Sequence, residues 1–141
     1  GTRTYLVARL KGDEGPMRHF RLDRIEAAAL EAASFARDPD FDLAAHARRA
    51  FGSFHDGQEY GEVIWRFAPH AADVARRFVF HPDQTLTDEP DGALTVRFAA
   101  AGHLEMCWHL YQWGDAVEVL APEALRRLVH PHRRGDFPAL P

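Results

Sequence analysis

A chain of 141 residues is long enough for one domain of ordinary size or for two small ones. Its apolar (46%) and charged (27%) fractions are those of soluble globular proteins and exclude a disordered chain, so we expect a packed core. The net charge of −4 excludes a globally basic protein, and the single cysteine, Cys107, cannot form an internal disulfide. The sequence has no signal peptide and no apolar run of roughly 20 residues, so we expect a cytoplasmic protein that does not span a membrane.

Residues 1–37 form the first expected segment. Thr4–Leu10 alternates with the strand period, a polar stretch with two glycines follows, and Met17–Ile25 again suits a strand. Together they predict a hairpin, which is marginal in water by itself, so we expect further strands from a missing part of the sheet or from a second chain. The segment has seven Arg or Lys against five Asp or Glu, whereas residues 38–141 have ten against sixteen, so a polyanion would prefer the hairpin.

Residues 38–60 are expected to be a linker with a short helix. Before them, Glu26–Arg37 is alanine-rich and could be a helix, or a strand that runs on into a loop. Asp38–Asp40 indicates a turn, and Asp42 is a candidate N-cap for a helix over Leu43–Phe51 that Gly52 ends. The polar stretch from Ser53 to Gly61 marks the boundary.

Residues 61–130 are expected to be a compact domain that begins with a strand and a helix. Val63, Trp65 and Phe67 alternate with Glu62, Ile64 and Arg66, as in a strand with one strongly buried face. Pro69 suits the first turn of a helix. Four positions of that helix keep the apolar i, i+3, i+4, i+7 spacing: Ala71, Val74, Ala75 and Phe78.

The rest of the domain repeats this pattern. A second strand is expected over Phe78–Leu86, a turn over Asp88–Gly92 and a third strand over Ala93–Ala99. The helix that follows Gly102 has an expected apolar stripe of Leu104, Cys107, Trp108 and Tyr111 and ends at Gly114. A fourth strand over Ala116–Leu120 and a short helix from Pro122 precede a tail, residues 131–141. The β-α-β-β-α-β order predicts an α+β, ferredoxin-like domain.

The second hairpin strand contains the candidate ligand site. By strand period, Arg18, Phe20, Leu22 and Arg24 share one face, and His19, Arg21 and Asp23 share the other. Two guanidiniums beside an apolar stripe can clamp a phosphate, and a base can stack on Phe20 or on nearby Tyr5. The alternative is an edge strand with solvated charges and an internal Arg–Asp pair.

Metal and catalytic sites find little support. His103 and Cys107 are four residues apart on one expected helix face, but two further ligands are lacking and Cys107 lies in the apolar stripe. No nucleophile elbow or glycine-rich phosphate loop is present, so we expect no cofactor, no metal and no enzyme. Four aromatic residues suit core positions better than a binding platform: Trp65, Trp108, Tyr111 and Trp113.

Several of these segments resemble a known family, the WYL-domain transcriptional regulators of bacteria. Thr4-Tyr5-Leu6 stands where the family has Trp-Tyr-Leu, and Arg18–Ile25 resembles its Arg-x-Phe-Arg-Leu-Asp-Arg-Ile strand. Segments that resemble the family's linker and the end of its C-terminal extension, called WCX, are Phe41–Leu43, Phe51–Gly52, Trp113–Gly114, Val117–Pro122 and Leu125–Arg126.

This resemblance implies that residues 1–37 are the last part of an Sm-like β-barrel and that residues 61–130 are the ferredoxin-like extension. It implies an effector such as single-stranded nucleic acid or a nucleotide, with Tyr5, Arg18, Arg21 and Arg24 as the ligand-binding residues. It also implies a homodimer, and operator binding only through a helix-turn-helix domain absent from this chain. Two departures are Thr4 in place of the first family Trp, and the absence of the earlier barrel strands.

The alternative of another class is a stand-alone ferredoxin-like module that binds a small molecule or a protein partner, on its sheet face or in a helix groove. An upstream helix-turn-helix would favour the regulator, whereas an immediate start codon would favour the module.

Overall fold

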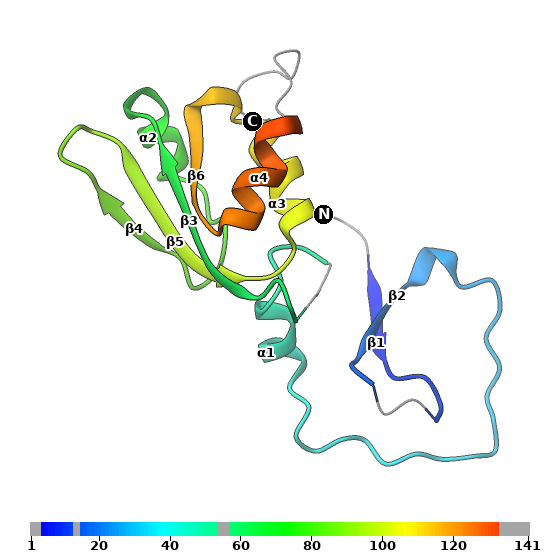
Figure 1. Cartoon of the computed structure of the whole chain (residues 1–141). Helices are drawn as coiled ribbons and strands as arrows, with labels where there is room; N and C mark the ends of the chain where they lie inside the picture. The colour runs from blue at the N-terminus through cyan, green and yellow to red at the C-terminus, as the bar shows by residue number, and fades with distance from the viewer. Residues whose placement is uncertain (1–3, 13–14, 54–56, 133–141) are drawn as a thin grey trace. The chain divides into compact units, whose positions relative to one another are not determined.

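The computed structural model of the chain describes residues 4–12, 15–53 and 57–132, with side chains up to residue 129 (Figure 1). It divides into two compact units, Gly1–Leu43 and Ala44–Pro141, which are described separately below. The division lies between Leu43 and Ala44, ahead of the stretch Ser53–Gly61 where we expected the boundary. In the described part of the chain, no helix has the length and apolarity needed to cross a membrane.

The first unit is a two-stranded ribbon. β1 (Tyr5–Ala8) pairs antiparallel with β2 (Arg18–Arg21), with Tyr5 opposite Arg21. The prediction that the second strand extends to residue 25 is wrong, because a 3₁₀ turn, η1 (Leu22–Arg24), follows directly. The turn forms because the Leu22 N–H donates to the Thr4 carbonyl at 3.1 Å and the Ile25 N–H closes back on the Leu22 carbonyl at 3.2 Å.

The chain from the turn to residue 37 contains neither helix nor strand. Leu30 and Phe35 are almost fully exposed, so a helix here would gain nothing from packing, and alanine content alone does not stabilise a helix of this length. The turn at Asp38 is confirmed, since its carboxylate accepts the Asp40 N–H at 3.0 Å.

The short helix α1 (Leu43–Arg48) begins at the predicted residue but ends three residues early. The Phe51 N–H donates to the Ala101 carbonyl at 2.9 Å and the Ala101 N–H to the Arg49 carbonyl at 2.8 Å. These bonds form a parallel bridge between Ala50 and Ala101 and take residues 49–51 out of the helix.

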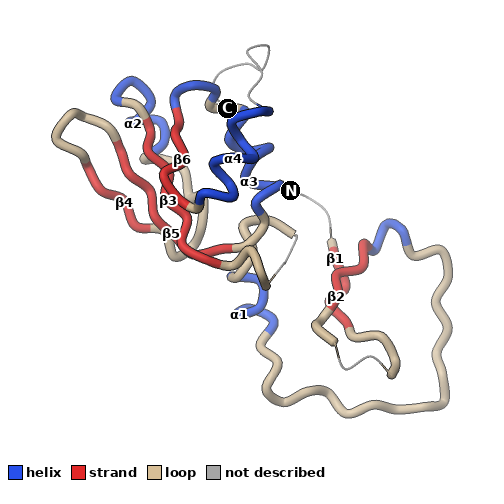
Figure 2. Tube along the Cα trace, in the orientation of Figure 1, coloured by secondary structure: helices blue, strands red, loops and turns tan. Residues whose placement is uncertain are grey.

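The second unit is built on a four-stranded antiparallel sheet (Figure 2). Its strands are β3 (Gly61–Phe67), β4 (Thr85–Asp88), β5 (Leu94–Ala100) and β6 (Val117–Ala121), in the spatial order β4-β5-β3-β6. With its helices, this is the ferredoxin-like topology predicted from the sequence. Pro122 lies after a cis peptide bond at the end of β6.

Helices cover the face of the sheet on which Val63, Trp65 and Phe67 lie, and all three side chains are fully buried. The helices are α2 (Pro69–Ala75), α3 (His103–Tyr111) and α4 (Glu123–His132), with a 3₁₀ turn, η2 (Gly114–Ala116), before β6. In Figure 1, α3 and α4 lie side by side. As the predicted stripe of α2 requires, Ala71 and Ala75 are buried in this core.

The prediction of a strand over Phe78–Leu86 is largely wrong, because β4 begins only at Thr85. Residues 78–84 form a loop fastened by the Gln84 side chain, whose Oε1 accepts the Phe80 N–H at 2.6 Å and whose Nε2 donates to the Phe78 carbonyl at 2.9 Å. The loop turns Phe80 and His81 into the core.

The predicted apolar stripe of α3 is also wrong in part. Leu104 and Trp108 are 50% and 58% exposed, whereas Met106, Cys107 and Leu110 are buried. Apolar residues lie on two overlapping faces of this helix. The face with Met106, Cys107 and Leu110 packs into the core, as does the fully buried Trp113 that follows the helix.

Candidate functional site

The ribbon brings two of the four predicted ligand-binding residues together. Residues that lie opposite each other in an antiparallel pair share a face. Tyr5 is opposite Arg21 and Val7 is opposite His19, so these four lie on one face of the ribbon. The Tyr5 and His19 rings are 6.3 Å apart at 52°, which places two aromatic rings beside one guanidinium.

The other two predicted residues lie elsewhere. Arg18 pairs with Ala8 and shares the opposite face with Phe20. Arg24 belongs to η1, so the expected face of Arg18, Phe20, Leu22 and Arg24 does not continue beyond Phe20. A clamp formed by Arg18 and Arg24 on one strand face is therefore not present in this structure.

Arg21 already has an anionic partner. Its Nε donates to Asp23 Oδ1 at 2.9 Å, and its Nη2 forms an ion pair with the other oxygen of the same carboxylate. This hydrogen bond raises the pKa of Arg21, so the guanidinium stays charged. An external phosphate at this face would have to displace Asp23 or share the guanidinium with it.

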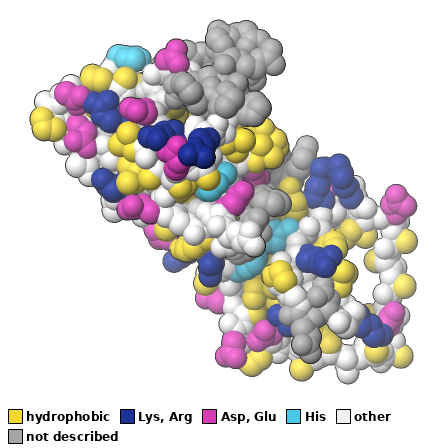
Figure 3. Space-filling view, viewed as in Figure 1, with side chains coloured by type: hydrophobic (Ala, Val, Ile, Leu, Met, Phe, Trp, Pro, Cys, Tyr) yellow, Lys and Arg dark blue, Asp and Glu magenta, His cyan; other side chains and the backbone are white. Residues whose placement is uncertain are grey.

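The visible surface does not contain one large basic patch. In Figure 3, Lys and Arg side chains are interspersed with Asp and Glu side chains on that face. Exposed ion pairs fit this distribution, including Arg97 with Glu62 at 3.6 Å and Arg76 with Asp88.

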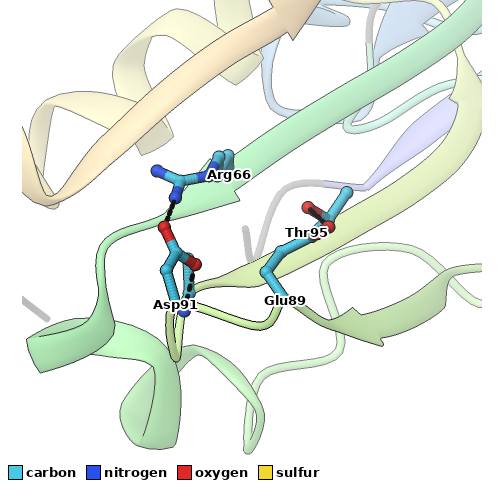
Figure 4. Close-up of polar contacts among 5 residues, drawn as sticks. Arg66, Glu89, Asp91 and Thr95 are labelled. Atoms are coloured by element: carbon cyan, nitrogen blue, oxygen red, sulfur yellow. Dashed lines mark hydrogen bonds and ion pairs between the residues drawn. The ribbon is translucent and has the colours of Figure 1, made fainter.

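A polar cluster lies at the turn between β4 and β5 (Figure 4). Arg66 of β3 forms an ion pair with Asp91, whose other carboxylate oxygen accepts the Ala93 N–H at 3.1 Å. The buried Thr95 donates its hydroxyl to Glu89 at 2.6 Å. These partners lie within the unit and join the turn to β3, so we interpret the cluster as structural.

The helix that carries His103 and Cys107 is also satisfied internally. The Cys107 thiol donates to the Tyr111 hydroxyl at 3.1 Å, and burial raises the pKa of this thiol. Among the described residues, no three His, Cys, Asp or Glu side chains are placed to hold a metal ion. The His103 ring, by contrast, has a buried Nε2 without a hydrogen-bond partner among the groups described.

An open groove runs between β6 and α4. Valine side chains of both elements form its apolar part, and its rim has both charge signs; the lining residues are Asp115, Val117, Glu118, Val119, Glu123, Arg126, Arg127 and Val129. Arg127 donates to Glu123 at 3.0 Å, and Arg126 pairs with the same carboxylate.

Sequence reasoning missed the residues that join the linker to α3. Glu59 Oε2 accepts the N–H groups of Gly102 and His103 at 3.1 and 3.0 Å, and so caps the start of α3. The Glu105 carboxylate accepts the Ser53 N–H at 2.8 Å. No local pattern signals either bond, because each joins residues more than 40 positions apart.

Comparison with known proteins identifies one family. The family model "WCX domain" matches residues 60–130. Among solved structures, Proteasome accessory factor B/C (PafBC) of Arthrobacter aurescens is 21% identical over 82% of this chain, with a TM-score of 0.40. The alignment spans only 17% of that protein. No curated protein matches the chain.

Proposed function

Because the chain belongs to the WCX-domain family, whose members are C-terminal domains associated with WYL-type regulators, we propose that it is the ligand-sensing and dimerisation portion of a bacterial WYL-type transcriptional regulator. The match over residues 60–130 carries this proposal. The role is binding and signal transfer in the cytoplasm, without catalysis. Operator DNA is contacted through a helix-turn-helix domain outside this chain.

We propose single-stranded nucleic acid or a nucleotide as the effector. The shared face of Tyr5, His19 and Arg21 supports this effector class. The Arg21 guanidinium can bind a phosphate, and a base can stack on either of the two rings beside it. Arg18 and Arg24 are proposed to contact neighbouring phosphates from outside that face. The half-exposed apolar residues of the ribbon support a homodimer, since a second chain or further strands would cover them.

Titration of a fluorescent single-stranded oligonucleotide into the full-length parent protein, across a salt series, tests this proposal. Arg21→Gln is expected to weaken binding and to reduce the slope of log affinity against log salt by about 1. Arg77→Gln, which changes an exposed arginine that follows α2, is the matched control and should leave binding unchanged. Binding that is equal for wild type and Arg21→Gln would exclude this face.

The alternative function, a stand-alone ferredoxin-like module for a small molecule or protein partner, is favoured by the groove between β6 and α4. It predicts that Arg126→Gln and Arg127→Gln change ligand binding while Arg21→Gln does not. The same set of variants therefore distinguishes the two functions.

A further inference from the structure

A partly buried histidine of α3, His109, accepts a hydrogen bond that defines its protonation state. The Trp113 indole N–H donates to Nε2 of His109 at 3.2 Å, and Trp113 is fully buried. An indole nitrogen can only donate, so Nε2 of His109 must lack a proton. The ring is therefore the neutral tautomer that has its hydrogen on Nδ1.

Aromatic rings from several segments surround His109. The rings recorded in contact with it, none of them charged, are Phe51, Trp65, Phe78, Phe80 and Trp113. Two of them lie edge to face, Phe80 at 5.5 Å and Phe51 at 5.6 Å. Burial in this surrounding lowers the pKa of His109.

One of these rings anchors the segment Arg48–Ser53, which we call the linker seat. Phe51 packs against Trp65 at 5.5 Å and Phe98 at 6.0 Å, and its N–H is bonded to Ala101. Within the second unit, the short bridge to Ala101 and the Phe51 ring hold the linker seat against the sheet. The Phe51 ring also contacts His109.

A second histidine holds the start of the seat. His81 Nδ1 accepts the Asp83 N–H at 3.2 Å, so its Nε2 carries the hydrogen and donates to the Arg48 carbonyl at 2.8 Å. The His81 ring also stacks on Phe98 at 5.3 Å. The bond between Asp83 and His81 thus requires a neutral ring as well.

Other titratable groups lie against the seat. The Glu105 carboxylate binds the Ser53 N–H, the Arg49 guanidinium lies 4.4 Å from the centre of the Tyr60 ring, and Asp83 is two residues from His81.

We propose that the linker seat is a pH-sensitive latch, closed by neutral His109 and opened when His109 is protonated. A proton on Nε2 would turn the acceptor of the Trp113 N–H into a second donor and place a cation among rings that include Phe51. Attraction to the stacked Trp65 ring offsets part of the desolvation but does not restore the lost hydrogen bond.

The direction of the effect follows from linkage. His109 has a lower pKa in the closed state than the ordinary value near 6.5, so the open state binds the proton more readily. The latch is fully closed above about pH 6.5 and is lost as the pH falls through the lowered pKa.

Two NMR measurements on the full chain between pH 7.5 and 5.0 test the latch. The His109 ring resonance should titrate below pH 6.5, and the exchange protection factor of the Phe51 amide should fall by roughly fivefold or more. His70→Phe, at an exposed histidine of α2, is the matched control and should retain the pH dependence. An ordinary pKa for His109, or constant Phe51 protection, would overturn the proposal.

Two variants separate the latch from general acid sensitivity. Trp113→Phe removes the donor that faces Nε2, so the pKa of His109 should rise and the latch should open at higher pH. His109→Phe removes the titrating ring, so Phe51 protection should lose most of its pH dependence. If His109→Phe does not fold, Trp113→Phe alone decides, and an unchanged His109 titration in that variant contradicts the mechanism.

Discussion

Both units of this chain contain apolar side chains, but only the second unit buries them in a core. Between Thr4 and Arg49, no described residue is buried, and Leu6 and Leu22 are nearly half exposed. From Ala50 onward, the sheet and helices enclose an aromatic core centred on Trp65 and Phe67. The ribbon has backbone pairing without a core. Strand pairing alone provides no buried core here, and a two-stranded ribbon of this kind is marginal in water.

The strongest test of this difference compares phenylalanines from the two units. Phe67→Ala should lower the free energy of unfolding by about 3–5 kcal/mol, because it leaves a cavity beside Phe80 and Trp113. Phe20→Ala in the ribbon should cost less than about 1 kcal/mol. Urea titration followed by amide NMR resonances of each unit measures both changes. Equal losses would show that the ribbon has its own core in solution.

A second comparison sharpens the assignment within the compact unit, on a single helix. Leu110→Ala should cost about 2–4 kcal/mol, because this side chain of α3 is buried. Trp108→Ala should stay within about 0.5 kcal/mol, because more than half of its side chain is exposed. A larger loss for Trp108 would restore the stripe predicted from the sequence.

A smaller effect is expected where the linker caps α3. Glu59→Ala should cost about 1 kcal/mol, since it leaves the N–H groups of Gly102 and His103 without their acceptor. Glu62→Ala is the matched control, because its exposed ion pair with Arg97 contributes little. The same urea titration measures both, and indistinguishable values would mean that the cap is not formed in solution.

The smallest effect concerns alkaline pH. Burial raises the pKa of Cys107 above its value in the unfolded chain, so the folded state binds this proton more tightly. The protonated Cys107 thiol therefore stabilises the fold fully at a pH below its pKa in the unfolded chain. This stabilisation is lost as the pH rises through its pKa in the folded state. Unfolding at pH 7.5, 9 and 10 should show a decline that is shallower in Cys107→Ala. Parallel declines would indicate an exposed thiol.

Local patterns predicted the parts of the fold that local physics decides. Alternation gave the bounds of β3, and Pro69 gave the start of α2, because burial on one face is visible in the order of residues. The ferredoxin-like order followed from the sequence of such elements.

The errors occurred where distant groups decide. Phe80 lies in a stretch that we expected to be a strand, but the Gln84 side chain accepts its N–H and holds it in a loop. α1 ends early because the Ala101 carbonyl accepts the Phe51 N–H. The expected strand face of Arg18 and Arg24 is not formed, because the 3₁₀ turn at Leu22 takes Arg24 out of the strand. The role that we propose for His109 depends on its contacts with the Trp113 and Phe51 rings. Residue spacing alone does not predict contacts between aromatic rings.

The central position of β3 also affects how the chain is made. β3 is synthesised before both of its neighbours, and Ala100 at the end of β5 lies 33 residues after Phe67. At ordinary synthesis rates, the apolar face of Val63 and Trp65 therefore waits roughly 2 to 7 s for its first strand partner. The second unit can close only when β6, the other neighbour of β3, has left the ribosome.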